Sequence, residues 1–329
     1  MTESNFCDII IKMSDPIFSP HILRAETLED GVTQSELSMF DECAFKWNAR
    51  YNWLLQRADH FPWPLFVGAA WHNFQEAFHK DPNCDVTKFV EPVIPGNIAR
   101  DSEFEKWLDY WACVMPAYQQ VYARIYEEER HHEWFIVEEE LSANLLDFKI
   151  RGKIDLASET LKFIRDFKST ASAWLTAPDG WQFKLQFMTY CWLMVQNYPK
   201  WGKKKFAFQL DMMQKPGLKQ TKADGTWTGH ITRVCNDIAS RPEFYFQRSS
   251  CDIFPEAIKR FEDEVLVPKL QRLALVRDNP AECESIILNK NTNACNSFGN
   301  RCEFWDICEK GWDVSKFFFQ NREIKHQEL

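Results

Sequence analysis

Three β-prone segments follow one another in the middle of the chain, and they limit the possible folds more than any other feature. Residues 133–141, 145–156 and 161–167 are short, rich in apolar residues, and separated by Ser, Asn and Glu residues typical of turns. We predict that they form three consecutive strands of a meander. Because segments with helical periodicity lie on both sides, the pattern predicts an α/β protein with a sheet flanked by helices.

Helices are predicted before and after these strands. Thr33 and Glu36 form a capping box at the start of a helix over residues 33–55, in which apolar residues recur at three- and four-residue steps. The same spacing predicts helices over residues 66–79, 101–129, 181–196 and 254–277. Further strands are predicted over residues 204–212, 226–234 and 243–247.

No repeat or low-complexity stretch interrupts the 329 residues, so we treat residues 1–329 as a single domain. It has a helical part at 33–130, a core at 131–212, and accessory strands, a helix and a tail at 213–329. No apolar run approaches the roughly 18 residues that a membrane-spanning helix needs. The first twenty residues also lack the layout of a secretory signal, so we expect a cytoplasmic protein.

Carboxylates and a lysine gather at the predicted ends of two neighbouring strands. Asp155 lies near the end of one strand, and Asp166 and Lys168 project from the same face of the next. An antiparallel pairing through residues 158–160 would bring the two carboxylates together. Such a group suits a hard divalent cation and an activated water. The alternative is an edge-strand ion pair between Asp166 and Lys168, with Asp155 capping a turn.

Two helical motifs flank these strands. The segment Gly68-Ala-Ala-Trp-His72 places His72 one turn beyond Gly68, and Gln186-Phe-Met-Thr-Tyr190 places Gln186 and Tyr190 on one helix face. Each motif has a structural alternative. His72 would then be a hydrogen-bonded histidine of the core, and Tyr190 an ordinary tyrosine of an amphipathic helix.

The motifs GAAWH, GKID, DFK and QFMTY, in this order, resemble those of the PD-(D/E)xK nuclease superfamily. The resemblance is to its RecB-like branch with an iron–sulphur cluster, which includes the AddB nuclease domain, CRISPR-adaptation exonucleases and many phage nucleases. It implies a restriction-endonuclease-like core, a mixed sheet flanked by helices, with helical additions and a cysteine-ligated C-terminal cluster. It also implies a Mg²⁺- or Mn²⁺-dependent deoxyribonuclease, specifically an exonuclease acting in recombination, repair, phage DNA metabolism or defence.

The resemblance assigns metal ligands. Asp155, Asp166 and the backbone carbonyl of Phe167 would bind Mg²⁺ or Mn²⁺, and His72 would add a nitrogen ligand that favours Mn²⁺. Glu138 is a candidate for an acid just outside the ligand set, with Glu139 and Glu140 beside it as alternatives.

The resemblance also assigns the chemistry of the reaction. Lys168 would activate the attacking water, and Gln186 and Tyr190 would position the scissile strand. The rival hypothesis is a catalytically inactive DNA-binding or assembly module that retains the nuclease fold and the metal cluster. Metal-dependent turnover of DNA distinguishes the two.

The chain contains 11 cysteines, an odd number that makes a disulfide framework unexpected in a chain without a signal peptide. Cys113, Cys191 and Cys235 stand singly among apolar residues, and we predict that they are small buried hydrophobes. Three further cysteines differ because they share one Asn- and Gly-containing segment at 293–308, which is typical of a loop with metal ligands.

In the RecB-like branch, an N-terminal cysteine and three cysteines near the C-terminus bind a [4Fe-4S] cluster. The resemblance therefore implies a cluster held by Cys43, Cys295, Cys302 and Cys308. Four thiolates suit Zn²⁺ equally well, so a structural zinc ion is the alternative.

Charge is distributed unevenly along the chain. The 39 basic and 48 acidic residues give a net charge of −9, which argues weakly against a nucleic-acid partner. Residues 199–222, however, contain seven lysines and one acid, together with Trp201 and Phe206. Lysines can hold DNA phosphates, and an exposed aromatic ring could stack on an unpaired base. A solvated strand and loop is the alternative. The lysines that we assign to DNA binding are Lys203, Lys204 and Lys205.

The resemblance also implies what this chain binds. DNA, as a single strand or as duplex ends, is the expected substrate, and a helicase, recombinase or integrase is the expected kind of protein partner. No membrane partner is expected. The cytoplasm would be that of a bacterial cell or of a phage-infected host.

Overall fold

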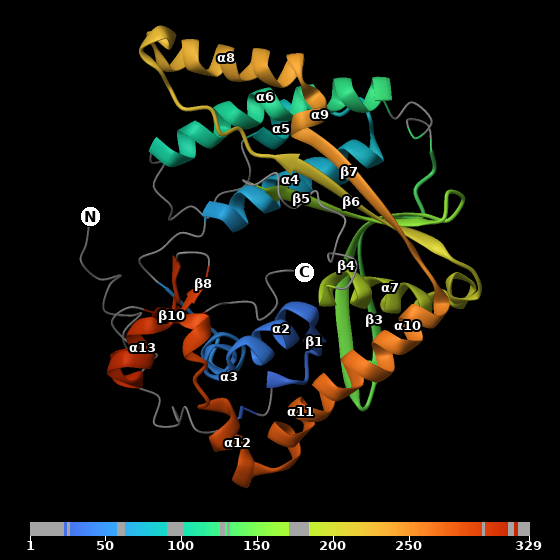
Figure 1. Cartoon of the computed structure of the whole chain (residues 1–329), viewed down its shortest axis with the longest axis vertical. Helices are drawn as coiled ribbons and strands as arrows, with labels where there is room; N and C mark the ends of the chain where they lie inside the picture. Colours follow the sequence, from blue (N-terminus) through green and yellow to red (C-terminus); the bar gives the residue numbers. More distant parts are fainter. Residues whose placement is uncertain are drawn as a thin grey trace, which may run out of the picture. The chain divides into compact units, whose positions relative to one another are not determined.

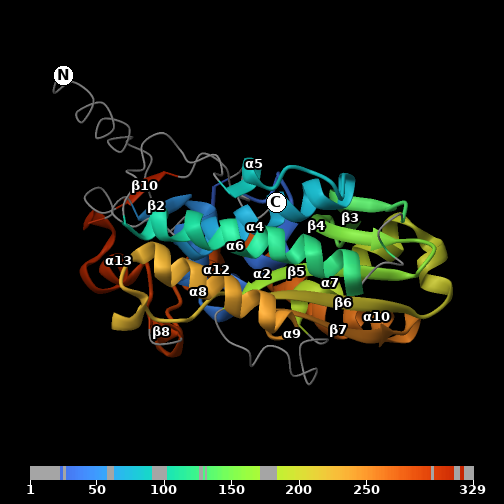
Figure 2. The same cartoon turned by 90° about the horizontal axis from the view of Figure 1, so that it is seen from above.

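A computed structural model of the chain describes residues 23–24, 27–57, 63–90, 102–125, 129, 132–170, 184–297, 300–314 and 319–321 (Figures 1 and 2). The chain forms two compact units. The first consists of Met1–Phe61, Ser142–Gly152 and Glu256–Leu329, and the second of Pro62–Leu141 and Lys153–Pro255. No helix within the described residues is both long enough and apolar enough to cross a membrane.

The main sheet is mixed, and most of it belongs to the second unit. The predicted meander is confirmed as β3 (Ile136–Leu145), β4 (Phe148–Ser158) and β5 (Phe163–Thr170). Ser142–Gly152, at the adjoining ends of β3 and β4, belongs to the first unit. The next predicted strand is β6 (Phe206–Gln214), which runs parallel to β5. Parallel neighbours need a crossover, and the helix α7 (Leu185–Asn197) lies in that connection. In sheet order, β3 and β5 flank β4, and β6 follows β5.

Helices α4 (Trp63–Lys80) and α6 (Ser102–Ile125) confirm two predicted helices, with the short helix α5 (Thr87–Val90) between them. Their apolar side chains pack with Phe163 and Phe167 of β5 in one core. Because strand side chains alternate, Asp166 and Lys168 project from the other face of β5. The predicted inward orientation of Phe167 is therefore confirmed.

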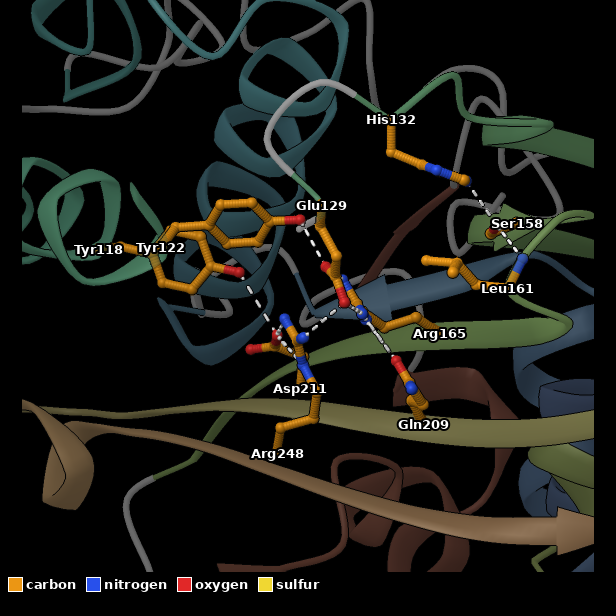
Figure 3. Close-up of polar contacts among 10 residues, drawn as sticks. All are labelled: Tyr118, Tyr122, Glu129, His132, Ser158, Leu161, Arg165, Gln209, Asp211 and Arg248. Carbon is orange, nitrogen blue, oxygen red and sulfur yellow. Dashed lines mark hydrogen bonds and ion pairs between the residues drawn. The ribbon is translucent and has the colours of Figure 1, made fainter. Parts of the chain in front are cut away.

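A buried ionic network lies beside the core and includes Arg165, the residue before Asp166 on β5 (Figure 3). The fully buried Arg165 binds both oxygens of Glu129, at 2.8 and 2.9 Å, and Oε1 of Gln209 on β6. Arg248 contacts Glu129 at 3.0 Å and Asp211 at 2.6 Å. Burial raises the pKa of Glu129, but Arg165 outweighs it and lowers that pKa to about 2. The network thus ties β5, β6 and β7 (Phe246–Ile253) together.

Two predicted strands are wrong. Residues 226–234 begin the helix α8 (Trp227–Ser240), and residues 243–247 divide between α9 (Pro242–Tyr245) and β7. The Thr226 hydroxyl accepts a hydrogen bond from the backbone N–H of Gly229 at 3.1 Å and caps α8. The β-branched residues of this segment suggested a strand, but their spacing places one helix face in the core.

The prediction for Cys113 and Cys235 is also wrong. They form a disulfide between α6 and α8, with their Cα atoms 5.2 Å apart. The two helices run side by side in both views (Figures 1 and 2). A pairing across 122 residues of sequence depends on that packing, which a local pattern does not reveal. Cys191 is buried, as predicted.

In the first unit, the predicted helix over 33–55 is divided. It begins as predicted, with the Thr33 hydroxyl accepting from the N–H of Glu36 at 3.2 Å, but α2 (Gln34–Glu42) ends before Cys43. Cys43 is extended, with φ −163° and ψ 109°, and α3 (Ala44–Trp47) and the π-helix η4 (Asn48–Asn52) follow. The break therefore lies at a cysteine that the sequence assigned to a metal cluster.

The rest of the first unit is mainly helical. The predicted C-terminal helix is confirmed as α10 (Pro255–Phe261), η10 (Glu262–Leu266) and α11 (Val267–Asp278). A short strand β1 (Val32–Thr33) pairs with β4, and β2 (Leu55–Arg57) pairs with β10 (Phe319–Asn321). The remaining elements are α12 (Pro280–Ile287), η11 (Thr292–Cys295), β8 (Asn296–Ser297), β9 (Asn300–Arg301), α13 (Trp305–Lys310) and η12 (Trp312–Val314).

Candidate metal and nuclease site

A histidine and two carboxylates converge in the second unit, from α4, β3 and β4. Nδ1 of His72 lies 3.1 Å from Oε1 of Glu138 and 3.6 Å from Oδ2 of Asp155. One ligand atom from each residue lies within 4.8 Å of the other two. Within the described part of the chain, this is the group of His, Cys, Asp and Glu side chains spaced to hold one ion.

The backbone conformation of Glu138 distinguishes it from its two neighbouring glutamates. Its φ is +52°, in the left-handed region that non-glycine residues seldom occupy. This conformation interrupts the alternation of β3, so the Glu138 side chain is 3% exposed, whereas Glu139 and Glu140 are exposed. Strained backbone of this kind persists where surrounding contacts hold it. The sequence left the three glutamates equivalent, and the structure brings Glu138 to the site.

The buried carboxylate of Asp155 connects this group to β5. Its Oδ2 accepts a hydrogen bond from the backbone N–H of Phe167 at 2.7 Å. Burial raises the pKa of Asp155 to about 7, with Asp166 and Glu138 adding to the shift and His72 opposing it. Burial lowers the pKa of His72, but the two nearby carboxylates outweigh it and raise that pKa overall.

Asp166 is the centre of a second polar group. Nζ of Lys168 lies 2.9 Å from its Oδ2, and Nε2 of Gln186 lies 3.3 Å from its Oδ1. The same Gln186 nitrogen donates to the hydroxyl of Tyr190 at 3.0 Å. The predicted i, i+4 pair on α7 therefore faces the strand that carries Asp166.

The structural alternatives for these residues describe only part of this geometry. The ion pair of Asp166 and Lys168 exists, on a strand that pairs with β6 along its whole length and with β4 over residues 163–165. Asp155 lies inside β4 and does not cap a turn. The His72 side chain is 28% exposed beside two carboxylates, and so is not a residue of the core.

The charges of the site suit a cation. Three carboxylates, from Glu138, Asp155 and Asp166, are accompanied by two lysines, Lys153 and Lys168. The site therefore carries one net negative charge when all three carboxylates are ionised and His72 is neutral, the protonation state in which these groups can bind a cation. The buried Oδ2 of Asp166 has the ion pair with Lys168 as its one polar contact among the described residues. Oxygen ligands with one imidazole suit Mg²⁺ or Mn²⁺.

Lys153 is a residue of the site that the sequence reasoning missed. Its Nζ lies 2.8 Å from Oε2 of Glu138. The signal was present in the GKID motif, because Lys153 and Asp155 are two residues apart on one strand and so share a face.

Among the described residues, there is space beside Gly68, one turn before His72. Apart from its two neighbours and the nearby backbone of α4, a Cβ at this position would meet no described atom within 4 Å. A glycine inside a helix costs about 1 kcal/mol relative to alanine, and packing of the described residues gives no reason for it.

The four predicted cluster cysteines all lie in the first unit, where Cys43, Cys295, Cys302 and Cys308 line one small cavity. The backbone N–H of Cys302 donates to the carbonyl of Cys295 at 2.8 Å, and the N–H of Asn291 lies 3.5 Å from Sγ of Cys43. No three of their sulfur atoms reach the 4.8 Å spacing seen around His72 among the described residues. Burial raises the pKa of the Cys302 and Cys308 thiols.

The predicted DNA-binding lysines are exposed. Lys203 is the last residue of η8 (Pro199–Lys203), and Lys204 and Lys205 lie between it and the start of β6. Lys205 pairs with Asp252 at 2.6 Å. The expectation that a neighbouring aromatic ring could stack on a base is wrong, because Trp201 and Phe206 are 2% and 3% exposed. Their rings pack against each other.

One comparison with known proteins identifies a family. Residues 31–309 match a family model described as the PD-(D/E)XK nuclease superfamily. No curated protein matches the chain. The crystal structure of a "putative exonuclease" from Eubacterium rectale is similar over 91% of this chain and 92% of that one, with 12% identity and a TM-score of 0.43. The family assignment rests on the sequence match.

Proposed function

This chain belongs to the PD-(D/E)XK nuclease superfamily, and from that membership and the site geometry we propose that it is a divalent-metal-dependent deoxyribonuclease. The observation that carries the proposal is the meeting of His72, Glu138 and Asp155 within 4.8 Å. Asp166 and Lys168 stand on the adjacent strand. We assign the chain to the RecB-like branch and expect exonuclease activity in DNA recombination, repair, defence or phage DNA metabolism.

The proposed ligands are the carboxylates of Asp155 and Asp166, the imidazole of His72 and the backbone carbonyl of Phe167. Glu138 joins this set, because its Oε1 faces His72 directly. A divalent cation held there would polarise a phosphoryl oxygen and lower the pKa of a bound water.

The remaining residues act on the water and the DNA strand. Lys168, held beside Asp166, would orient the attacking water and offset charge on the phosphorus. A bond forms between the water oxygen and phosphorus as that water gives up a proton to solvent, the phosphorus–oxygen ester bond breaks, and the leaving oxygen takes a proton from solvent. Gln186 and Tyr190, hydrogen-bonded to each other, would position the scissile strand. The open surface at Gly68 would leave room for that strand beside His72.

The proposed function is tested on end-labelled linear DNA, single- and double-stranded, with Mn²⁺, Mg²⁺ or EDTA. We expect metal-dependent loss of label from linear DNA and none from covalently closed circles, as for an exonuclease. Cleavage of closed circles would indicate an endonuclease. DNA binding without turnover in any metal would instead favour the inactive DNA-binding or assembly module.

We further propose that Cys43, Cys295, Cys302 and Cys308 hold a [4Fe-4S] cluster with a structural role, with Zn²⁺ as the alternative. Their shared cavity supports this proposal. The extended backbone at Cys43 supports it too, because it interrupts a helix at this residue. Either metal would link segments about 250 residues apart and so stabilise the first unit.

Anaerobically purified protein is expected to be brown, with broad absorption near 400 nm that Cys302→Ser reduces. The control is Cys191→Ala, which removes a buried cysteine outside the cavity. A colourless protein with one equivalent of zinc would show that the four cysteines hold a structural Zn²⁺ and not a [4Fe-4S] cluster. Wild-type protein that contains neither metal, with a thermal stability that Cys302→Ser leaves unchanged, would contradict both the cluster and the zinc site.

We propose that the lysines at the start of β6 bind DNA phosphates. Reversing Lys203 and Lys204 to Glu is expected to weaken DNA affinity about tenfold near 100 mM salt and to reduce the salt dependence of binding. The control is Lys219→Glu with Lys222→Glu, which changes net charge equally beyond the other end of β6. Fluorescence anisotropy with Ca²⁺ in place of the catalytic metal measures the affinity. Equal DNA affinities of the two double variants would contradict a specific role of Lys203 and Lys204 in DNA binding.

A further inference from the structure

Lys153 and His72 hold the two oxygens of the Glu138 carboxylate separately. Nζ of Lys153 lies 2.8 Å from Oε2, and Nδ1 of His72 lies 3.1 Å from Oε1. The Glu138 side chain is 3% exposed, so solvent contributes little to holding it. The Lys153 side chain itself is 31% exposed.

We propose that Lys153 is a positioning residue of the metal site. It occupies Oε2 of Glu138 and so presents Oε1 alone toward His72 and Asp155. The inference rests on the proposed function, because it concerns the affinity of the same site for its cation. Lys153 touches neither the cation nor the DNA in this role.

The terminal torsion of glutamate is broad, so its carboxylate turns easily unless a partner holds it. The left-handed backbone at Glu138 directs the side chain to the site but does not set the rotation of the carboxylate. An ion pair to one oxygen sets that rotation, and it leaves the other oxygen as a one-atom ligand. Partners that orient ligands in this way typically contribute 10- to 100-fold in metal affinity.

Two other roles for Lys153 predict different measurements. A salt bridge that only supports the strand would change thermal stability slightly and leave metal affinity unchanged. A direct contact to a DNA phosphate would raise the KM for DNA, again without changing metal affinity. Binding of Mn²⁺ in the absence of DNA therefore separates the positioning role from both.

The experiment is calorimetric titration of the metal-free full-length protein with Mn²⁺. Lys153→Met is expected to weaken Mn²⁺ binding 10- to 100-fold, and Lys153→Arg to restore it to within about threefold of wild type. Lys149→Met is the matched control, because Lys149 is an exposed lysine of the same strand with the same alternation. Wild-type affinity in Lys153→Met, or no recovery in Lys153→Arg, would overturn the inference.

A double-mutant cycle ties the effect to Glu138. In a Glu138→Gln background, adding Lys153→Met is expected to weaken Mn²⁺ binding less than threefold, because no carboxylate remains to be held. The same 10- to 100-fold loss in that background would also overturn the inference. The proposed function fails separately, if wild-type protein binds no Mn²⁺ at all. Lys153→Gln serves as the second truncation should Lys153→Met fail to give a folded protein by circular dichroism.

Discussion

Asp155→Asn is expected to reduce DNA turnover at least ~10³-fold, while making the metal-free protein more stable at pH 8. The activity falls because an amide is a poor ligand for a hard cation compared with a carboxylate. Loss of several kcal/mol of transition-state stabilisation corresponds to a rate effect of this size. The fold is kept, because an Asn oxygen can still accept the hydrogen bond from the N–H of Phe167.

The gain in stability follows from the raised pKa of Asp155. Burial, with the nearby Asp166 and Glu138, raises this pKa to about 7, whereas an unfolded chain has an Asp pKa of about 3.9. Between these values the folded protein binds more protons than the unfolded chain, so stability of the metal-free protein falls as pH rises from about 4 to 7. Above pH 7 the buried charge is present at its full cost. Asn removes that charge, with a gain on the order of 2 kcal/mol.

Thermal unfolding with EDTA at pH 5 and pH 8 measures this effect. The Tm difference between Asp155→Asn and wild type is expected to be positive at pH 8 and smaller at pH 5. Asp147→Asn is the control, because Asp147 is an exposed turn residue with a left-handed φ that Asn also tolerates. A lower Tm than wild type at pH 8, or retained activity, would contradict the proposed role of Asp155.

Lys168→Met is expected to lower kcat about 10²- to 10⁴-fold, with a much smaller effect on Mn²⁺ affinity. Burial lowers the pKa of Lys168, but Asp166 and Asp155 outweigh it and raise that pKa above its ordinary value. Lys168 is therefore a cation at neutral pH in the metal-free protein. A cation orients water and stabilises charge on the phosphate more readily than it removes a proton.

Lys168→Arg separates these two actions. Arginine keeps the charge and cannot act as a base, so we expect it to retain more activity than Lys168→Met. Lys162→Met is the matched control, because Lys162 lies just before β5 with its side chain 48% exposed. A kcat for Lys168→Met within threefold of wild type would remove Lys168 from the chemistry. Equal loss in both Lys168 variants would instead favour proton removal.

Local periodicity accounts for what could be predicted of the site. Side chains alternate along a strand, so Asp166 and Lys168 had to share a face, and their 2.9 Å ion pair reflects this. Residues four apart on a helix are neighbours, and Gln186 and Tyr190 are hydrogen-bonded at 3.0 Å. Both relations join residues two or four positions apart in the sequence. They can therefore be predicted from a short segment alone.

Long-range packing and backbone strain account for what could not be predicted. The Cys113–Cys235 disulfide needs α6 and α8 to be neighbours, and the segment after Thr226 became a helix because its apolar face meets the core. Neither fact is contained in a window of ten residues. Trp201 is also buried by packing, against Phe206, although the lysines around it in the sequence suggested that it would be exposed.

Local sequence pattern is enough to predict the family, the three consecutive strands β3, β4 and β5, and the alternation that places Asp166 and Lys168 on one face. Contacts between distant elements are needed to distinguish Glu138 from the two glutamates beside it. Glu138 is turned inward by a left-handed φ of +52° and is held between His72 and Lys153. Three consecutive glutamates are chemically identical, so only contacts from other elements can stabilise one of them in a strained conformation.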